Sequence, residues 1–181
     1  MRKIILVSAT PKEHGGLTEL YGIPIFQVGI GKVSAATNLT EIILTERPDV
    51  VINFGSCGNL KNHKIGGLLQ VGKVINDLDT MGLSENPPIK LCGTDIKCFT
   101  TDTIYDRTHS RYTDTYNSAI EDCNIVDMEC YALAQVCKRM GVEFQSYKWV
   151  SDDGTPDDWE DNAQIGFENF TKLLNEEYFQ N

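Results

Sequence analysis

The sequence predicts an α/β fold: a three-layer arrangement in which a central mixed, largely parallel sheet is flanked by helices. Two observations lead to this prediction. Short apolar runs alternate along the chain with longer segments that have the apolar spacing of helices. Some runs contain consecutive β-branched residues without polar alternation, which is typical of strands covered on both faces. The 181 residues contain no linker, repeat or low-complexity tract, so a single domain over residues 1–181 is expected.

The first part of the chain is predicted to contain two strands and a helix. Lys3–Ser8 is interpreted as a buried strand, because its apolar run is shorter than the roughly 7–15 residues of a signal-peptide core. Ala9–Gly16 is a loop or helix start, and Ile23–Val28 is the second strand. Lys32–Glu46 is predicted to be a helix that ends before Pro48, since the residue before a proline avoids the α region. The predicted apolar face of this helix consists of Val33, Ala36, Leu39, Ile42 and Ile43.

Two glycine-containing turns flank this helix and the strand after it. Gly29 and Gly31 precede the helix and allow a ligand to approach the main chain. Val50–Ile52 is predicted to be a short buried strand that ends in a tight turn at Asn53–Gly58. Open α/β sheets bind their ligands at the carboxyl ends of such strands.

The second part of the chain continues the alternation. Strands are predicted at Leu68–Asn76, Ile96–Thr101, Asn124–Asp127 and Phe144–Val150, and helices at Tyr112–Glu121, Met128–Met140 and Asp158–Phe179. Asp77–Leu91 is expected to be irregular, and Gly141 is a suitable residue to end the second of these helices.

Composition and charge limit the partners. The net charge of −10 argues against nucleic acid and anionic membrane surfaces, because both attract basic proteins. No apolar run approaches the roughly 20 residues of a membrane-spanning helix. The six cysteines form no C-x-x-C pair, so they are expected to be reduced thiols that fill the core of a cytoplasmic protein. A cysteine-based redox protein stays an alternative that would need two cysteines close enough to bridge.

Common cofactor and metal motifs fail. The G-I-G-K segment lacks the first glycine of a P-loop, since Phe26 stands there, and Ser34 replaces the third glycine of a dinucleotide fingerprint. The acidic run after Val150 does not fit an EF-hand, because Trp149 falls on the first ligand position. There is no H-E-x-x-H segment. No cofactor and no metal are therefore expected.

Three acidic residues stand at the ends of predicted strands. Glu13 follows the first strand, Glu129 lies where a short strand becomes a helix, and Asp152 ends a late strand. Each has a plain structural interpretation: Glu13 as a surface residue, Glu129 in a first helical turn, and Asp152 as a turn or N-cap residue. Because the ends of strands in an open α/β sheet can converge on one crevice, the three together predict a site.

The motifs resemble those of the purine nucleoside phosphorylase/nucleosidase superfamily, and most closely its methylthioadenosine/S-adenosylhomocysteine nucleosidase branch. The segments G-I-G-K-V-x-A-A and P-D-V-V-I-N-x-G-S-x-G carry the resemblance first. V-D-M-E-C-Y-A-L-A-Q-V-C, W-V-S-D-D and S-A-T-P-K-E extend it. In order and spacing these motifs cover most of the chain. The resemblance implies a nucleoside phosphorylase-like fold.

The resemblance also assigns roles to residues. Asp152 is implied as the general acid to the purine, Glu129 as a ribose ligand, and Glu13 as the residue that positions the attacking water. The implied substrate-binding residues are Ile30, Ser56, Cys57, Gly58, Ile104, Tyr105, Met128 and Glu129. Of these, Met128 contacts the ribose, Ile30 makes an apolar contact, and the loop of Ile104 and Tyr105 closes over the base.

The implied function is that of a nucleosidase that hydrolyses the N-glycosidic bond of a purine nucleoside. The expected substrate is 5′-methylthioadenosine, S-adenosylhomocysteine or a related nucleoside. A phosphorolytic purine nucleoside phosphorylase is the first alternative, and a catalytically weak nucleoside-binding protein is the second. Hydrolysis is preferred because the glycine turns carry no arginine and Lys32 is the only nearby cation; Arg107 and Arg111 are the substitutes for a phosphate site.

The chain also departs from the family pattern. The segment between Glu13 and Gly29 is too short for the family's β-hairpin, and no helix is predicted in Asn76–Cys98. In relatives these regions shape the 5′ pocket and the dimer. The resemblance suggests a homodimer, but the 5′ substituent and the oligomeric state stay open.

Overall fold

The computed structural model describes residues 2–77, 87–106, 119–154 and 159–179. Within them, ten strands form one sheet whose main order is β2-β3-β1-β4-β9-β8-β6-β7, with β10 beside β4 and β5 beside β10. The strands are β1 (Ile4–Ser8), β2 (Glu19–Leu20), β3 (Ile23–Gln27), β4 (Val50–Asn59), β5 (Leu68–Gln70), β6 (Lys73–Asn76), β7 (Ile89–Lys90), β8 (Lys97–Thr100), β9 (Ile125–Asp127) and β10 (Glu143–Asp152). The helices are the short 3-10 turn η1 (Pro11–Glu13), α1 (Lys32–Glu46), α3 (Cys130–Met140), α4 (Trp159–Asn162) and α5 (Phe167–Phe179).

The sheet is mixed, and its long central strands run parallel. β1 pairs in parallel with β3 and with β4, β10 pairs in parallel with β4, and β8 pairs in parallel with β6 and β9. Shorter antiparallel pairs stand mostly at the margins, such as β2 with β3 and β6 with β7. This is the predicted fold class.

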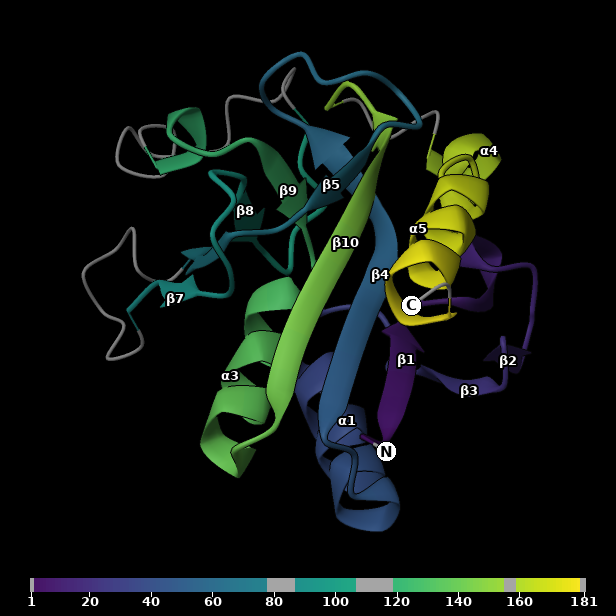
Figure 1. Ribbon diagram of the computed structural model, residues 1–181. Coiled ribbons are helices and arrows are strands. Elements are labelled where there is room, and N and C mark those ends of the chain that lie inside the picture. The colour runs from purple at the N-terminus through teal and green to yellow at the C-terminus, as the bar shows by residue number, and fades with distance from the viewer. Residues whose placement is uncertain (1, 78–86, 107–118, 155–158, 180–181) are drawn as a thin grey trace.

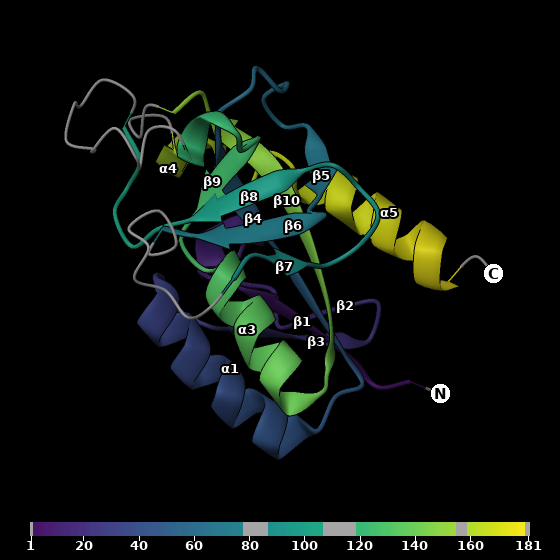
Figure 2. The same cartoon turned by 90° about the vertical axis from the view of Figure 1, so that its left-hand side faces the viewer.

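Helices cover both faces of the sheet and give three layers (Figure 1). Side chains of a strand alternate between faces. Ile5 and Val51 therefore pack with α1 and α3, whereas Leu6 and Ile52 pack with Phe170 of α5 on the other face. Figure 2 shows α1 and α3 side by side below the sheet. The parallel strands thus end at one edge between the two helical layers.

The predicted turn at Asn53–Gly58 is wrong, because β4 continues through it to Asn59. The reason is β10, which pairs with β4 from Val50 to Gly58 and keeps this glycine-containing stretch extended. The register shifts between Val150 and Asp152, at a β-bulge. The small residues of the G-S-C-G segment therefore lie on a strand within the sheet.

Helix α1 has the predicted bounds, and Leu39 and Ile43 of its predicted apolar face are buried, but Ala35 is more deeply buried than the predicted Ala36. Ala35, Leu39 and Ile43 are buried, whereas Val33 is 78% exposed. The helix ends at Arg47, which adopts a left-handed conformation before Pro48.

The segment between Glu13 and Gly29, expected to be too short for the family's β-hairpin, contains a very short hairpin. β2 and β3 form a minimal hairpin, since Leu20 pairs with Ile23 across a two-residue turn. Both turn residues, Tyr21 and Gly22, have positive φ, which matches the twist of a tight two-residue connection.

Two predicted elements are divided by close contacts at glycines. The run Leu68–Asn76 breaks into β5 and β6 at Val71-Gly72, because a side chain on Gly72 would meet the Thr94 backbone. The C-terminal helix breaks into α4 and α5, and Gly166 between them lies against Trp149.

Two further helix predictions are tested only in part. α3 begins at Cys130, two residues later than predicted, with Glu129 at the N-cap. Most of the helix predicted over Tyr112–Glu121 lies outside the described residues, and residues 119–121 are helical. No helix within the described ranges is long and apolar enough to cross a membrane.

Candidate active site

A cavity of about 210 Å³ lies where the carboxyl ends of β1, β9 and β10 meet β4. Its lining includes every residue that the sequence analysis assigned to a site: Glu13, Ile30, Ser56, Cys57, Gly58, Ile104, Tyr105, Met128, Glu129 and Asp152. Segments that are far apart in the sequence thus contribute to one concave space. The catalytic roles of these residues stay predictions.

Glu13 is buried at the wall of this cavity and is not the surface residue of the plain interpretation. Its Oε1 accepts hydrogen bonds from the Ser56 N–H at 2.8 Å and the Ser56 hydroxyl at 3.0 Å. Its Oε2 accepts from the N–H groups of Ala9 at 3.1 Å and Thr10 at 3.3 Å. Burial raises the pKa of Glu13, although the charge of Lys148 and these hydrogen bonds oppose the shift. The carboxylate therefore joins the end of β1 to β4.

Gly55 explains how Glu13 reaches the sheet. A Cβ on Gly55 would lie 2.4 Å from Glu13 Oε1, so a side chain here would push the carboxylate away. Gly55, the first glycine of the G-S-C-G segment, is therefore required by this close approach rather than by a turn.

Glu129 connects the start of α3 to the glycine turn before α1. Its Oε1 accepts a hydrogen bond from the Gly31 N–H at 2.9 Å, and Gly31 has a φ of +86° that favours glycine. Burial raises the pKa of Glu129 to about 8, and the negative charge of Asp127 adds to the shift. Glu129 therefore holds its proton more readily than an exposed glutamate does.

Lys148 is a cation that the sequence analysis missed, so the expectation that Lys32 is the only nearby cation is wrong. Lys148 lies on β10, is 2% exposed, and forms an ion pair of 2.9 Å with Asp127. Burial lowers the pKa of Lys148, but the charges of Asp127 and Glu129 outweigh burial and raise it overall. Lys148 is thus a buried positive charge close to three buried acids: Asp127, Glu129 and Glu13.

Asp127 is fully occupied by donors. Besides Lys148, it accepts hydrogen bonds from the Thr100 hydroxyl at 2.7 Å, the Cys130 N–H at 2.8 Å and the Cys98 thiol at 3.3 Å. Burial raises the pKa of Asp127, but Lys148 and these hydrogen bonds lower it overall. An ionised Asp127 therefore supports the first turn of α3, next to Glu129.

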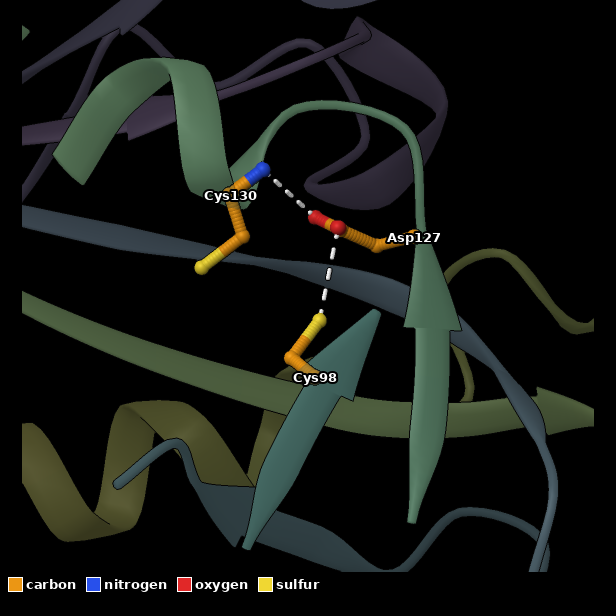
Figure 3. A group of neighbouring side chains, drawn as sticks. All are labelled: Cys98, Asp127 and Cys130. Atoms are coloured by element: carbon orange, nitrogen blue, oxygen red, sulfur yellow. Dashed lines mark hydrogen bonds between the residues drawn. The ribbon is translucent and has the colours of Figure 1, made fainter. Parts of the chain in front are cut away.

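In the described parts of the chain, one group of three side chains has atoms close enough to ligate a metal: Cys98, Asp127 and Cys130 (Figure 3). Lys148 already supplies a cation to Asp127, and burial raises the pKa of the Cys98 thiol well above its usual value. The arrangement therefore suits a hydrogen-bonded support for Asp127. All six cysteines are free thiols, and five of them are buried.

Asp152 lies at the end of β10, beside the bulge, and is 8% exposed. Its Oδ2 accepts from the Ser151 hydroxyl at 2.8 Å, and its Oδ1 accepts from the Gly154 N–H at 2.9 Å. The register places Asp152 opposite Gly58 of β4, and a Cβ on Gly58 would lie 3.2 Å from Asp152 Oδ1. The carboxyl group is therefore held at the cavity wall, directly beside Gly58.

The positive end of α1 is already neutralised. The Lys32 N–H donates to Asp102 Oδ1 at 2.7 Å, and the Lys32 ammonium is paired with Asp77 and Asp102. Arg107 and Arg111, the two arginines considered for a phosphate site, lie outside the described residues.

Sequence reasoning also missed Trp159 and Asp127 as cavity residues. Trp159 stands in an acidic run, where a single aromatic residue gives little signal. Asp127 precedes Met128 and Glu129 in the motif and was noted only as a change of acid. A lysine between aromatic residues in the strand-like run Y-K-W-V was the one available signal for Lys148.

Comparison with known proteins agrees with this geometry. The model of the phosphorylase superfamily matches residues 10–90 and 95–176. A 5′-methylthioadenosine/S-adenosylhomocysteine nucleosidase of Exiguobacterium sp. is 28% identical over 174 residues, which cover 82% of this chain and 72% of the relative.

Solved structures show the same fold. The corresponding nucleosidase of Neisseria meningitidis, in complex with methylthio-immucillin-A, has a TM-score of 0.80 at 18% identity, with 96% of this chain and 97% of that chain covered. The nucleosidase of Colwellia psychrerythraea, in complex with adenine, has a TM-score of 0.79 at 20% identity, with coverages of 96% and 93%.

The fold and the cavity define an α/β protein of the nucleoside phosphorylase-like class. The match to the family model covers most of the sequence, and the chain therefore belongs to the phosphorylase superfamily.

The raised pKa of Glu129 predicts how the variant Glu129→Gln changes stability with pH. The folded pKa of about 8 exceeds the ordinary value of 4.5, so the native state binds more protons than the unfolded state between these pH values. The wild type must therefore lose stability as pH rises through this window, whereas the glutamine variant lacks this loss.

Urea unfolding of both proteins from pH 5 to 9 measures the effect. The free energy of unfolding of Glu129→Gln, relative to wild type, should increase with pH up to about 8 and then level off. A total change on the order of a few kcal/mol is expected, since each pKa unit corresponds to about 1.4 kcal/mol. A difference that is constant over this range would contradict the assigned environment of Glu129.

Proposed function

We propose that this chain is a nucleosidase that hydrolyses the N-glycosidic bond of a purine nucleoside. The observation that carries the proposal is the convergence of Glu13, Glu129 and Asp152 on one cavity, in a chain of the phosphorylase superfamily. The names of the relatives point to 5′-methylthioadenosine, S-adenosylhomocysteine or a related nucleoside as substrate.

The reaction breaks the bond between C1′ of the ribose and N9 of the purine. The bonding electron pair leaves with the base, and positive charge develops on the ribose, as in other glycoside hydrolyses. Asp152 would give a proton to N7 so that the base leaves as a neutral molecule. A water molecule then adds its oxygen to C1′ and gives up one proton to a carboxylate of the site. This proton makes up for the one that Asp152 gave to the base, and the products are free base and free sugar.

The other two acids act on the ribose side of the cavity. Glu129 would bind the ribose hydroxyls, and in its ionised form, which its raised pKa makes less populated near neutral pH, its charge would stabilise the cationic sugar in the transition state. Glu13 would orient the attacking water from its position between the end of β1 and Ser56. Lys148 helps these carboxylates to be buried together, because its positive charge opposes the rise in pKa that burial causes in both.

Charge supports water over phosphate as the acceptor. A phosphate dianion needs cationic or N–H donors that are free to bind it. The described cavity lining includes no arginine or lysine, and the nearby Lys32 and Lys148 are paired with acids. Glu13 and Glu129 would repel an anion when they are ionised. The first alternative from the sequence analysis, that the chain is a phosphorylase, therefore has weaker support than a hydrolase.

We also propose that residues 1–181 form one nucleosidase domain that acts in the cytoplasm as a homodimer. The family match spans both halves of the chain, which supports one domain. Val33 at the start of α1 is 78% exposed and Ile30 beside the cavity is 52% exposed, so a second copy would cover apolar surface there. Sedimentation equilibrium that gives only the monomer mass at micromolar concentration would exclude the dimer.

Product analysis tests the hydrolase directly. Incubation of the protein with 5′-methylthioadenosine should release adenine together with the free sugar, and phosphate should not accelerate the reaction. Chromatography of parallel reactions in phosphate and in a phosphate-free buffer measures both products. A sugar 1-phosphate as the main product would indicate a phosphorylase. Ligand binding without base release would indicate a binding protein.

Asp152→Asn tests the assigned general acid. The amide keeps the shape of the side chain: its oxygen can accept from the Gly154 N–H, and its NH2 group can donate to the Ser151 hydroxyl, but it cannot donate a proton as a carboxylic acid does. The turnover number should fall by about 10²–10⁴-fold, while the unfolding midpoint changes little. Steady-state base release gives the turnover number, and near wild-type turnover would remove Asp152 from the mechanism.

A further inference from the structure

Trp159 is a cavity residue that the proposed mechanism does not use. It is the first residue of α4 and stands within an acidic run. Its indole N–H donates a hydrogen bond to the Ser56 hydroxyl oxygen at 2.9 Å. The Ser56 hydroxyl in turn donates to Glu13 Oε1 at 3.0 Å. A continuous chain of hydrogen bonds therefore runs from α4 through β4 to the carboxylate at the cavity wall.

The direction of this chain is fixed by its donors. An indole N–H can only donate, and a carboxylate can only accept. A serine hydroxyl has one proton and can rotate. When the indole donates to the hydroxyl oxygen, that oxygen uses a lone pair on Trp159 and directs its proton to Glu13. The hydroxyl would otherwise be free to turn toward the ligand space.

A second set of contacts holds α4 against the segment that carries Glu13. The Lys12 ammonium lies 5.4 Å from the centre of the Trp159 ring, within the range of a cation–π contact. Lys12 also forms an ion pair of 2.5 Å with Glu160. Lys12 and Glu13 are neighbours in η1, so both contacts connect α4 to the turn that places the carboxylate.

We propose that Trp159 is a positioning residue of this site, which orients Glu13 through the Ser56 hydroxyl. The proposal deepens the nucleosidase function and rests on it, since Glu13 is there assigned to the attacking water. Trp159 does not itself contact the reacting atoms in this mechanism. It fixes the hydrogen-bonding pattern of the residue that does.

The variant Trp159→Phe removes the indole donor and keeps an aromatic ring over Lys12. The turnover number should fall by about 3- to 10-fold, the equivalent of one hydrogen bond, and KM should stay within about twofold. Glu168→Gln is the matched control, because it removes only an exposed ion pair with Lys172 on α5, away from the cavity lining. This control should keep wild-type turnover.

A double-mutant comparison separates action through Ser56 from a general effect on α4. Ser56→Ala should lower turnover at least as much as Trp159→Phe, and the double variant should be no slower than Ser56→Ala alone. Independent effects that multiply in the double variant would overturn the proposal. Full turnover in Trp159→Phe would overturn it as well.

An NMR measurement tests the hydrogen bond without activity. The chain has two tryptophans, and Trp149 donates its indole N–H to the Ala163 carbonyl instead. In a ¹H–¹⁵N spectrum, Ser56→Ala should shift the Trp159 indole signal and speed its hydrogen exchange, while the Trp149 signal stays in place. An unchanged Trp159 signal would exclude the contact. If the wild type releases no base, the function fails, and this spectrum still decides the hydrogen bond.

Discussion

The site depends on one buried cation. Lys148 is almost fully enclosed, pairs with Asp127, and lies close enough to Glu13 and Glu129 to affect the pKa of both. Several acids cannot be buried in one small space without a compensating charge, because desolvation and mutual repulsion both oppose their ionised forms. The strand β10 carries both this cation and, at its end, Asp152, so one element supplies the compensating charge and one of the cavity's acids.

The sheet explains why these groups meet. β4 stays extended through its G-S-C-G segment because β10 pairs along it, and Gly55 leaves space for the Glu13 carboxylate. The start of α3 places Glu129 against the glycine turn of α1. The absence of a side chain at Gly55 therefore allows Glu13 to approach the main chain, and the positive φ of Gly31 shapes the turn whose N–H binds Glu129.

Local patterns predicted the elements better than they predicted the contacts. The bounds of α1 follow from its apolar period and Pro48, and the strand-end acids follow from the order of the motifs. The length of β4 could not be predicted from a local pattern, because its extension comes from pairing with β10, about 90 residues away in the sequence. Lys148 and Trp159 were missed for the same reason. A single lysine in a strand, or a single tryptophan in an acidic run, contributes to a site through partners that are distant in sequence, and the local pattern does not reveal them.

A double-mutant cycle in urea unfolding measures the coupling between Lys148 and Asp127, on which the buried site depends. Lys148→Met and Asp127→Asn should each lower the free energy of unfolding by about 3–5 kcal/mol, because each leaves a buried group without its partner. The double variant should lose less than the sum of the two, by more than about 1 kcal/mol. Losses that add within about 0.5 kcal/mol would show that the pair does not support the site.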